Sequence, residues 1–279
     1  MAVVGGGTMG TGIAYVFAQA GFITTVVEPH DSRAEAMATE LRTAADGAVQ
    51  RGKLDRTGAD AMLARIQRVR SIDSLASGLD LIVETVPERI ELKTAVLEAL
   101  SAKTPRLLAT NTSSISIDRL AAAVSAPELF VGMHFFNPVW SLPLVEIIRG
   151  TATSDIAVSE AERLVALIAK ESIVVADIPG FATSRLDLIA SLEAMRMLED
   201  GVASAADIDR AAELAYRHPV GPLRLSDIVG LDVRLDIARQ LESVYGERYR
   251  PPQILVDHVA AGHLGRKSGK GFHDWPTGS

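Results

Sequence analysis

Hydrophobic and polar residues follow one pattern in the first part of the chain and another beyond it. Up to about residue 178, short apolar runs rich in Val and Ile alternate with longer segments in which apolar residues recur every three or four positions. The short runs predict strands and the longer segments predict helices. Because strands that alternate with helices are typical of α/β folds, residues 1–178 are predicted to form a doubly wound sheet.

The individual elements follow from these runs. Strands are expected at the start of the chain and within 22–28, 79–88, 106–114, 129–138, 142–148 and 172–177. Helices are expected at 11–20, 89–101 and 154–169. The run at 142–148 follows its predecessor too closely for a helical crossover, so this strand is expected to be antiparallel.

Residues 31–69 are polar and alanine-rich, with apolar residues at helical spacing that Gly52 interrupts. They predict a pair of helices that projects from the sheet and is longer than a short crossover needs. Arg51 and Lys53 stand at the break between the two helices, where they can meet an anionic group of a ligand. The same two residues also fit solvated surface charges.

The pattern changes at the segment "IPGF", residues 178–181, beyond which no β-type run appears. Helices are predicted at 183–200, 204–216, 222–245 and 251–262, with Ser204 as an N-cap. Residues 179–279 are therefore predicted to form a second, all-helical domain. Its many apolar positions fit either the core of a monomer or a dimer interface.

The composition restricts the class of protein. The chain has 279 residues and no cysteine, which excludes disulfides and thiolate chemistry and fits a reducing compartment, so a cytoplasmic protein is expected. Its 28 Lys and Arg against 35 Asp and Glu include no basic block, so nucleic acid is not expected as a partner. No apolar run reaches the ~18 residues of a membrane span, and the scattered histidines argue against a metal site.

The chain begins with a β-type run followed by Gly5, Gly7 and Gly10 in G-x-G-x-x-G spacing. In a strand–turn–helix unit, the first glycine permits the tight turn and the second lets the backbone approach a pyrophosphate. The third lets the helix pack closely on the strand. Thr8 and Met9 lie in the same loop and at the start of the helix, whose N–H groups face the phosphates. The segment is predicted to bind a dinucleotide; a flexible loop without a ligand is the alternative.

Glu28 ends the second β-type run, about 20 residues beyond the glycines, where an acid can bond the ribose 2′-hydroxyl of a dinucleotide. A carboxylate at this point also repels a 2′-phosphate. The predicted cofactor is therefore NAD rather than NADP.

Three clusters of polar residues lie at the ends of predicted strands. They contain Asn111 and Ser113 in "NTSS", His134 and Asn137 in "HFFNP", and Glu146 in "LPLVEII". Ligands of open α/β sheets bind beyond the carboxyl ends of the strands, so these side chains are predicted to converge on one crevice.

The histidine and the glutamate of this set match the needs of alcohol oxidation. His134 suits a general base because an imidazole titrates near neutrality. Glu146 suits the group that orients the base and stabilises its cation. A histidine between apolar residues is also often a satisfied core residue. However, an unpaired buried carboxylate is costly, so Glu146 is predicted to pair with His134 on the preceding strand.

Seven segments of the chain resemble the L-3-hydroxyacyl-CoA dehydrogenases, and the bacterial 3-hydroxybutyryl-CoA dehydrogenases are most similar. They are "VVGGGTMGTGIA", "NTSS", "GMHFFNPV", "LVEII", "PGF", "GPLRLSDIVGLD" and "GRKSGKGF", in that order. The resemblance implies a Rossmann domain, a helical C-terminal domain that forms a homodimer, and NAD as cofactor. It also implies oxidation of the 3-hydroxyl of an acyl-CoA, or the reverse reaction, with a short chain such as 3-hydroxybutyryl-CoA favoured.

The resemblance also implies roles for residues of the crevice. His134 corresponds to the catalytic base and Glu146 to its acidic partner. Ser113 corresponds to the serine that bonds the substrate oxygen, and Asn137 to an asparagine near the substrate carbonyl. Asn111 is placed among the cofactor contacts.

Further residues are implied to contact the ligands. Glu88 and Lys93 match positions close to the cofactor, and Lys267 matches a lysine of the tail that reaches the NAD site. Arg51 and Lys53 lie in the helix pair that contacts CoA in the family, which favours the ligand-binding interpretation of these two residues.

One position departs from the family pattern. Where the family commonly has "PGFIVNRLL", with its asparagine facing the active site, this chain has "PGFATSRLDL" and places Ser184 there. Serine is shorter and lacks the amide, so the preferred chain length or the rate is expected to differ.

Three alternatives stay open. The first is an NAD-dependent dehydrogenase of a CoA-free 3-hydroxy acid, of the carnitine or gulonate type, because a fold does not determine a substrate. The second is a non-catalytic NAD-binding protein of the crystallin type. The third is a piece of a larger fused enzyme, although a start at the first strand and an end just past "GKGF" fit a stand-alone protein better.

Overall fold

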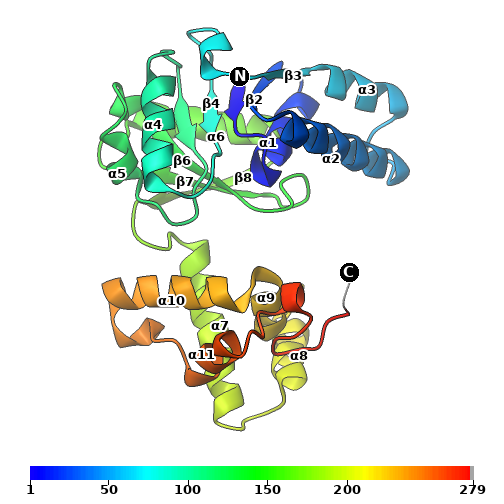
Figure 1. The fold of residues 1–279 in the computed structure, drawn as a ribbon, viewed down its shortest axis with the longest axis vertical. Helices are drawn as coiled ribbons and strands as arrows, with labels where there is room; N and C mark the ends of the chain where they lie inside the picture. The colour runs from blue at the N-terminus through cyan, green and yellow to red at the C-terminus, as the bar shows by residue number, and fades with distance from the viewer. Residues whose placement is uncertain (277–279) are drawn as a thin grey trace. The chain divides into compact units, whose positions relative to one another are not determined.

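The computed structural model describes residues 1–276. The chain folds into two compact units and passes from one to the other between Ile178 and Pro179. The first unit is an α/β domain and the second is helical (Figure 1). Both features confirm the predicted fold class.

One eight-stranded sheet forms the centre of the first unit, in the order β3-β2-β1-β4-β5-β6-β7-β8. Strands β1 to β6 are parallel to one another, β7 is antiparallel to β6, and β8 is parallel to β7. The reversal at β7 confirms the predicted antiparallel strand. The strands are β1 Ala2–Val4, β2 Thr24–Val27, β3 Ile66–Val69, β4 Ile82–Glu84, β5 Leu108–Thr110, β6 Phe130–Phe135, β7 Leu144–Arg149 and β8 Glu171–Ala176.

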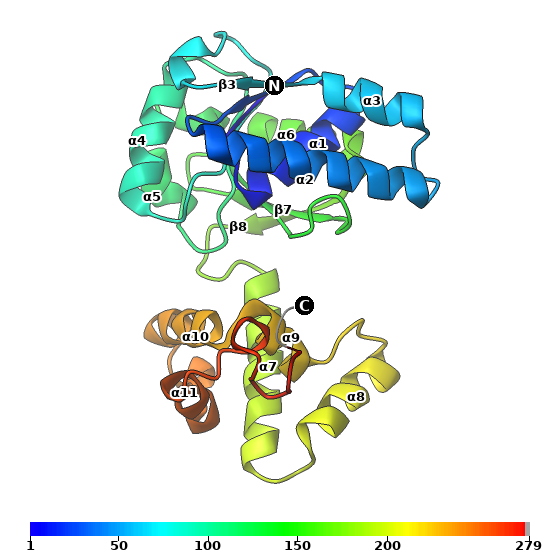
Figure 2. The same ribbon diagram turned by 45° about the vertical axis from the view of Figure 1, so that its right-hand side comes forward.

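Helices cover both faces of this sheet. Helices α1 and α6 share one buried core on one face, and α2 and α3 pack on α1. Helices α4 and α5 pack together on the other face. Figures 1 and 2 both show α2 beside α3, with their connecting turn away from the sheet. The helices are α1 Thr8–Gln19, α2 Asp31–Gln50, α3 Arg56–Ala64, α4 Ile90–Ser101, α5 Ile117–Ala121 and α6 Asp155–Leu167.

The strand register explains why the central strands are mostly apolar. Val26, Val3, Val83, Ala109 and Val131 are register partners across five strands, and all are fully buried in the core beneath α1 and α6. Their neighbours along each strand point to the opposite face, under α4 and α5. A strand buried on both faces has no polar position, so periodicity alone could not show its orientation.

The sequence interpretation of residues 31–69 was partly wrong. The break between the two helices falls at Arg51–Gly52, as predicted, but the second helix ends at Ala64. Residues Ile66–Val69 form the edge strand β3, paired with β2. Ile66 continues the helical spacing of Met62 and Leu63, which is why a four-residue strand was read as the end of a helix.

The second unit consists of helices around a single apolar core. They are α7 Thr183–Glu199, α8 Ala205–Tyr216, α9 Pro222–Val229, α10 Leu231–Tyr245 and α11 Gln253–Ala260. Ser204 caps α8 by accepting a hydrogen bond from the N–H of Asp207, as predicted. The predicted helix at 222–245 is two helices, because Gly230 adopts a φ of +107° that ends α9.

A buried aspartate holds the segment that follows α11. The carboxylate of Asp227, on α9, accepts hydrogen bonds from the N–H groups of Phe272 and His273 and from the indole of Trp275, each at 2.9 Å. This contact explains the aspartate of "GPLRLSDIVG": it fastens the glycine-rich tail to the core of the helical unit.

No helix in residues 1–276 is long and apolar enough to cross a membrane. In the same range, no group of three or more His, Asp or Glu side chains is arranged to hold a metal ion.

Candidate active site

The glycine turn after β1 brings the first helix very close to the sheet. Gly5 has a φ of +110°, and the hydroxyl of Thr85 donates to the carbonyl oxygens of Val4 and Gly5, both at 3.0 Å. A Cβ on Gly10 would lie 1.9 Å from the Gly5 oxygen, so only glycine fits there. A Cβ on Gly7 would meet no atom within 4 Å, which leaves space above the turn.

This geometry fits a dinucleotide. Helix α1 begins at Thr8, and no side chain caps its N-terminus. Its first N–H groups therefore face the open space above Gly7, where a pyrophosphate can accept them. The geometry of the three glycines therefore fits the separate tasks that their spacing predicts.

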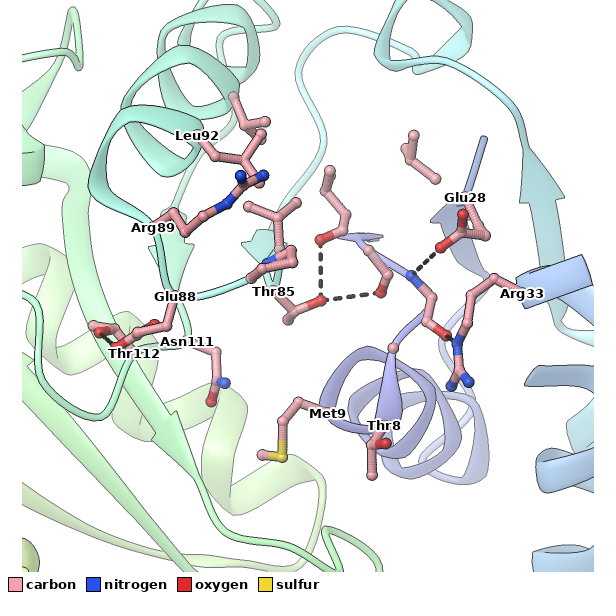
Figure 3. Close-up of a pocket in the computed structure, with 18 of the residues that line it drawn as sticks. Thr8, Met9, Glu28, Arg33, Thr85, Glu88, Arg89, Leu92, Asn111 and Thr112 are labelled. Atoms are coloured by element: carbon pink, nitrogen blue, oxygen red, sulfur yellow. Dashed lines mark hydrogen bonds between the residues drawn. The ribbon is translucent and has the colours of Figure 1, made fainter. Parts of the chain in front are cut away.

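A cavity of about 1090 Å³ opens beside this turn, at the carboxyl ends of the parallel strands. The loop after β1, Glu28 after β2, residues 85–89 after β4 and residues 111–113 after β5 all line it. Residues 134–137, at the end of β6, complete the wall. Figure 3 shows Thr8, Met9 and Asn111 facing this space from different elements. Of the five side chains predicted to converge on one crevice, Asn111, Ser113, His134 and Asn137 line this cavity, and Glu146 does not.

Glu28 is fixed at one end of the cavity. Its carboxylate accepts hydrogen bonds from the N–H of Gly6 at 3.0 Å and from that of His30 at 2.9 Å, and the residue is only 5% exposed. Both bonds come from backbone N–H groups, which fix the carboxylate without adding a cation to it. A fixed negative charge suits a partner that donates a hydroxyl hydrogen bond.

His134 and Glu146 meet on adjacent strands. They are register partners in the antiparallel pair β6–β7, so their side chains share one face of the sheet. Nδ1 of His134 lies 2.7 Å from Oε2 of Glu146. Both residues are buried, and the ring of Phe136 lies 4.4 Å from the imidazole, centroid to centroid. The imidazole lines the cavity while the carboxylate lies behind it.

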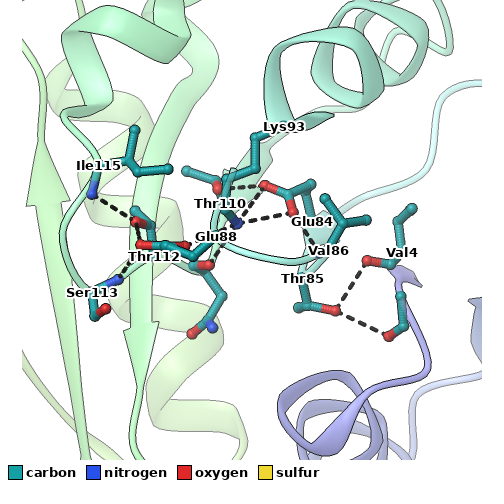
Figure 4. A network of polar contacts seen from close by, with 12 residues as sticks. Val4, Glu84, Thr85, Val86, Glu88, Lys93, Thr110, Thr112, Ser113 and Ile115 are labelled. Carbon is teal, nitrogen blue, oxygen red and sulfur yellow. Dashed lines mark hydrogen bonds and ion pairs between the residues drawn. The ribbon is translucent and has the colours of Figure 1, made fainter. Parts of the chain in front are cut away.

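Ser113 is carried by a loop that one carboxylate oxygen organises. Oε1 of Glu88 accepts hydrogen bonds from the hydroxyl of Thr112, from the N–H of Ser113 at 3.2 Å, and from the N–H and hydroxyl of Ser114 (Figure 4). Asn111 precedes the loop, and its side-chain oxygen accepts the N–H of Phe135 at 2.9 Å. Glu88 and Asn111 therefore set the position of Ser113 relative to the end of β6.

Lys93 was expected among the cofactor contacts, but the structure places it beneath the cavity floor. It is fully buried, and its Nζ lies 3.0 Å from both carboxylate oxygens of Glu84 and 3.0 Å from the backbone oxygen of Asn111. These three acceptors use all three ammonium hydrogens. Lys93 also lies 3.6 Å from Oε2 of Glu88 (Figure 4). It therefore supports the loop that carries Ser113 rather than facing a ligand.

The other predicted residues lie as follows. Asn137 lines the cavity. Arg51 and Lys53 are exposed at the α2–α3 turn and are not among the residues that line it. Ser184, in the first turn of α7, and Lys267 belong to the second unit, where Lys267 pairs with both carboxylate oxygens of Asp232 at 2.6 Å.

Four residues that shape the site were missed. Glu84 and Thr85 end β4, so the rule that selected Asn111 and His134 at strand ends applied equally to them. Phe136 was visible only as part of "HFFNP". Arg33, which lines the cavity from the first turn of α2, carried no signal beyond its charge.

The sheet order, the glycine turn and the cavity define a dinucleotide-dependent oxidoreductase domain. Residues 1–178 match the family model described as "3-hydroxyacyl-CoA dehydrogenase, NAD binding domain", and residues 180–275 match "3-hydroxyacyl-CoA dehydrogenase, C-terminal domain". The chain therefore belongs to the 3-hydroxyacyl-CoA dehydrogenase family, and NAD is its cofactor.

Individual relatives match over nearly the whole chain. A 3-hydroxybutyryl-CoA dehydrogenase of Bradyrhizobium diazoefficiens is 39% identical over 98% of this chain and 94% of its own. A probable 3-hydroxybutyryl-CoA dehydrogenase of Bacillus subtilis is 37% identical over 98% and 96%. The crystal structure of (S)-3-hydroxybutyryl-CoA dehydrogenase from Ralstonia eutropha superposes with a TM-score of 0.94, at 36% identity over 99% and 98% of the two chains.

Replacing Lys93 by Met should destabilise the protein in a pH-dependent way. Burial raises the pKa of Glu84, while Lys93, Thr110 and the N–H of Val86 lower it. Without Lys93 the pKa of Glu84 rises further. The variant therefore loses stability as the pH rises through that raised pKa, because Glu84 then becomes a buried charge without its partner. It regains stability at lower pH, where Glu84 binds a proton. Breaking a buried pair costs about 3–5 kcal/mol.

Thermal unfolding at pH 5.5 and pH 8 measures this effect. The difference in Tm between the native protein and the K93M variant should be larger at pH 8. A difference that is equal at both pH values would show that Glu84 carries no uncompensated charge in the variant.

Proposed function

We propose that the protein oxidises the 3-hydroxyl group of a short-chain 3-hydroxyacyl-CoA, 3-hydroxybutyryl-CoA in the first instance, or reduces the corresponding 3-oxoacyl-CoA. The observation that carries the proposal is the His134–Glu146 pair at 2.7 Å, on the wall of the cavity that the glycine turn opens. The names of the similar enzymes support the substrate.

The roles of the residues follow from their positions. Nδ1 of His134 donates to Glu146, which leaves Nε2 as the basic nitrogen of that tautomer. Nε2 takes the proton of the substrate 3-hydroxyl, and Glu146 stabilises the imidazolium that results. Ser113 and Asn137 hold the substrate oxygens as the carbonyl forms. NAD, when bound, accepts the hydride that leaves C3.

The cofactor and the CoA moiety are assigned to separate groups. Gly5, Gly7, Gly10, Thr8 and Met9 hold the pyrophosphate. Glu28 bonds the adenosine ribose, Asn111 and Glu88 shape the wall beside the nicotinamide, and Lys267 is assigned to the cofactor by family likeness. Arg51 and Lys53 are proposed to meet the phosphates of CoA, and Ser184 the acyl group. The absence of cysteine suits a reducing compartment, and we assign the protein to the cytoplasm.

A substrate comparison tests the proposed activity. With NAD⁺, turnover measured by NADH absorbance should be high for (S)-3-hydroxybutyryl-CoA and at background for free 3-hydroxybutyrate, carnitine and gulonate. The reason is that the CoA moiety supplies binding energy that the free acids lack.

Two results would contradict the proposal. If a free acid is turned over as fast as the CoA ester, the protein belongs to the CoA-free class. If no substrate is turned over although NADH binds tightly, the protein is non-catalytic.

Exchanging Arg51 and Lys53 together for Ala should raise KM for the CoA ester by about tenfold with little change in kcat. The reason is that charges remote from the reacting atoms bind the ground state and the transition state equally.

The His134→Ala variant should lose activity but keep its cofactor. Removing a general base costs about 10²–10⁴-fold in kcat. Glu146→Gln should cost less, because the imidazole remains. Stopped-flow or steady-state kinetics gives kcat, and NADH fluorescence titration gives the dissociation constant, which should stay within about twofold. Full activity of H134A would disprove the role of His134.

We also propose that the helical unit mediates a homodimer. Leu186 on α7, Leu214 and Tyr216 on α8 and Val244 on α10 are apolar side chains that are 52–76% exposed. Large apolar side chains exposed on one domain are candidates for an interaction site, and the resemblance to the family implies a dimer through this domain.

Sedimentation velocity tests the dimer against a chain mass of 29.7 kDa. The native protein should sediment at twice that mass, and L214E or L186E should shift it towards the monomer because a buried charge is costly. Ile156→Glu is the matched control: Ile156 is equally exposed, at 76%, but lies on α6 of the first unit. A dimer that L214E and L186E leave intact would place the interface elsewhere.

A further inference from the structure

The end of the cavity that holds Glu28 also contains two arginines. Arg33, in the first turn of α2, and Arg70, just after β3, line the cavity together with His30 and Ser71. An acid at this point selects a ribose hydroxyl, whereas arginines at the same point suit a ribose 2′-phosphate. The pocket therefore contains groups of both kinds, and which of them prevails depends on their geometry.

Glu28 and Arg33 are attached to the same residue of the glycine turn. The N–H of Gly6 donates to Glu28 at 3.0 Å, and the carbonyl oxygen of Gly6 accepts Nε of Arg33 at 2.7 Å. Nη2 of Arg33 also donates to Glu40 at 3.1 Å. Figure 3 shows Glu28 and Arg33 next to each other at the same end of the pocket, beside the glycine turn. The guanidinium is thus held in place beside the ribose subsite before any ligand binds.

Arg70 contributes a second positive charge, which is more exposed to solvent than that of Arg33. Its guanidinium pairs with Asp31 at 2.7 Å, but Asp31 also pairs with Arg68 at 2.6 Å, so one carboxylate serves two arginines. The side chain of Arg70 is 68% exposed, against 33% for Arg33. Solvent screens exposed charges more strongly, so Arg33 should act more strongly on a bound phosphate than Arg70.

We propose that Arg33 is a second determinant of cofactor choice, and that this chain contains a 2′-phosphate subsite which Glu28 alone keeps closed. A 2′-phosphate carries about −1.5 to −2 charges at neutral pH and cannot share the subsite with a fixed carboxylate. The planar fork of Arg33 suits phosphate oxygens once that carboxylate is removed. NAD is selected because the effect of Glu28 is larger than that of the arginines. Glu28 repels the 2′-phosphate of NADP and also binds the ribose hydroxyl of NAD.

Binding of NADH and NADPH, measured by fluorescence titration without any substrate, tests this proposal independently of the acyl-CoA assignment. Glu28→Ser should tighten NADPH binding by about tenfold or more, since a hydrogen bond to a charged group is worth about 1.5–3 kcal/mol. Glu28→Gln keeps the size of the side chain and removes only its charge, and should give a smaller gain in the same direction.

The double variant E28S/R33A distinguishes a specificity role of Arg33 from a structural one. If Arg33 binds the 2′-phosphate, adding R33A to E28S should weaken NADPH binding about tenfold more than it weakens NADH binding. If Arg33 only braces Gly6, both affinities fall by the same factor and their ratio stays at the E28S value. E28S/R70A should lose less of the gain than E28S/R33A.

Arg106→Ala in the E28S background is the matched control. Arg106 is 77% exposed, pairs with Asp80 at 3.5 Å and does not line the cavity, so its removal should leave the ratio of the two affinities unchanged. Equal NADPH binding by E28S and E28S/R33A would overturn the proposal. Failure of both E28S and E28Q to improve NADPH binding would also overturn it.

Discussion

The parallel pairing of β1 to β6 is the constraint on which the site depends, because it directs the carboxyl ends of six strands to one edge of the sheet. Residues that are far apart in the sequence, such as Gly7, Asn111 and His134, therefore line one cavity. The close approach of α1 to β1 completes this edge. It requires that Gly10 have no Cβ, because a Cβ there would clash with the backbone of Gly5. The end of the cavity beside the glycine turn therefore depends on glycine at this position.

The reversal of direction at β7 supplies what the parallel strands cannot. A parallel neighbour would carry its polar end residue beyond the same edge, beside His134 rather than behind it. An antiparallel neighbour instead places Glu146, a residue inside the strand, directly opposite His134. The carboxylate is buried behind the imidazole and the imidazole faces the cavity. This arrangement orients the ring from the side of the core and leaves the cavity side for a ligand.

The fold class, the family and the cofactor followed from the sequence because each rested on several residues at fixed spacing. The errors at the site came from single residues. Lys93 was assigned by motif to the cofactor, but a lysine in the first turn of α4 can point to the cavity or to a buried acid beneath it. The argument that paired Glu146 with His134, that a buried carboxylate needs a partner, applies equally to Glu84 at the end of β4 and leads to Lys93. Arg33 had no such signal, because its role depends on the fold of the glycine turn. The catalytic roles of His134, Ser113 and Asn137 stay predictions.

Four acids stand in or around the site, and the donors that hold each one determine what it can do. Glu84 is held by an ammonium group in the core, so its charge is compensated and acts on no ligand. Glu88 is held by the N–H groups and hydroxyls of a loop, so it sets the shape of that loop. Glu146 is held by an imidazole, whose ring it orients. Glu28 is held by two backbone N–H groups, which fix its position without cancelling its charge, and it can therefore select between ligands by charge. The same residue type is thus suited to support, to positioning, to the proposed catalysis or to the proposed selectivity, according to the partner that the fold supplies.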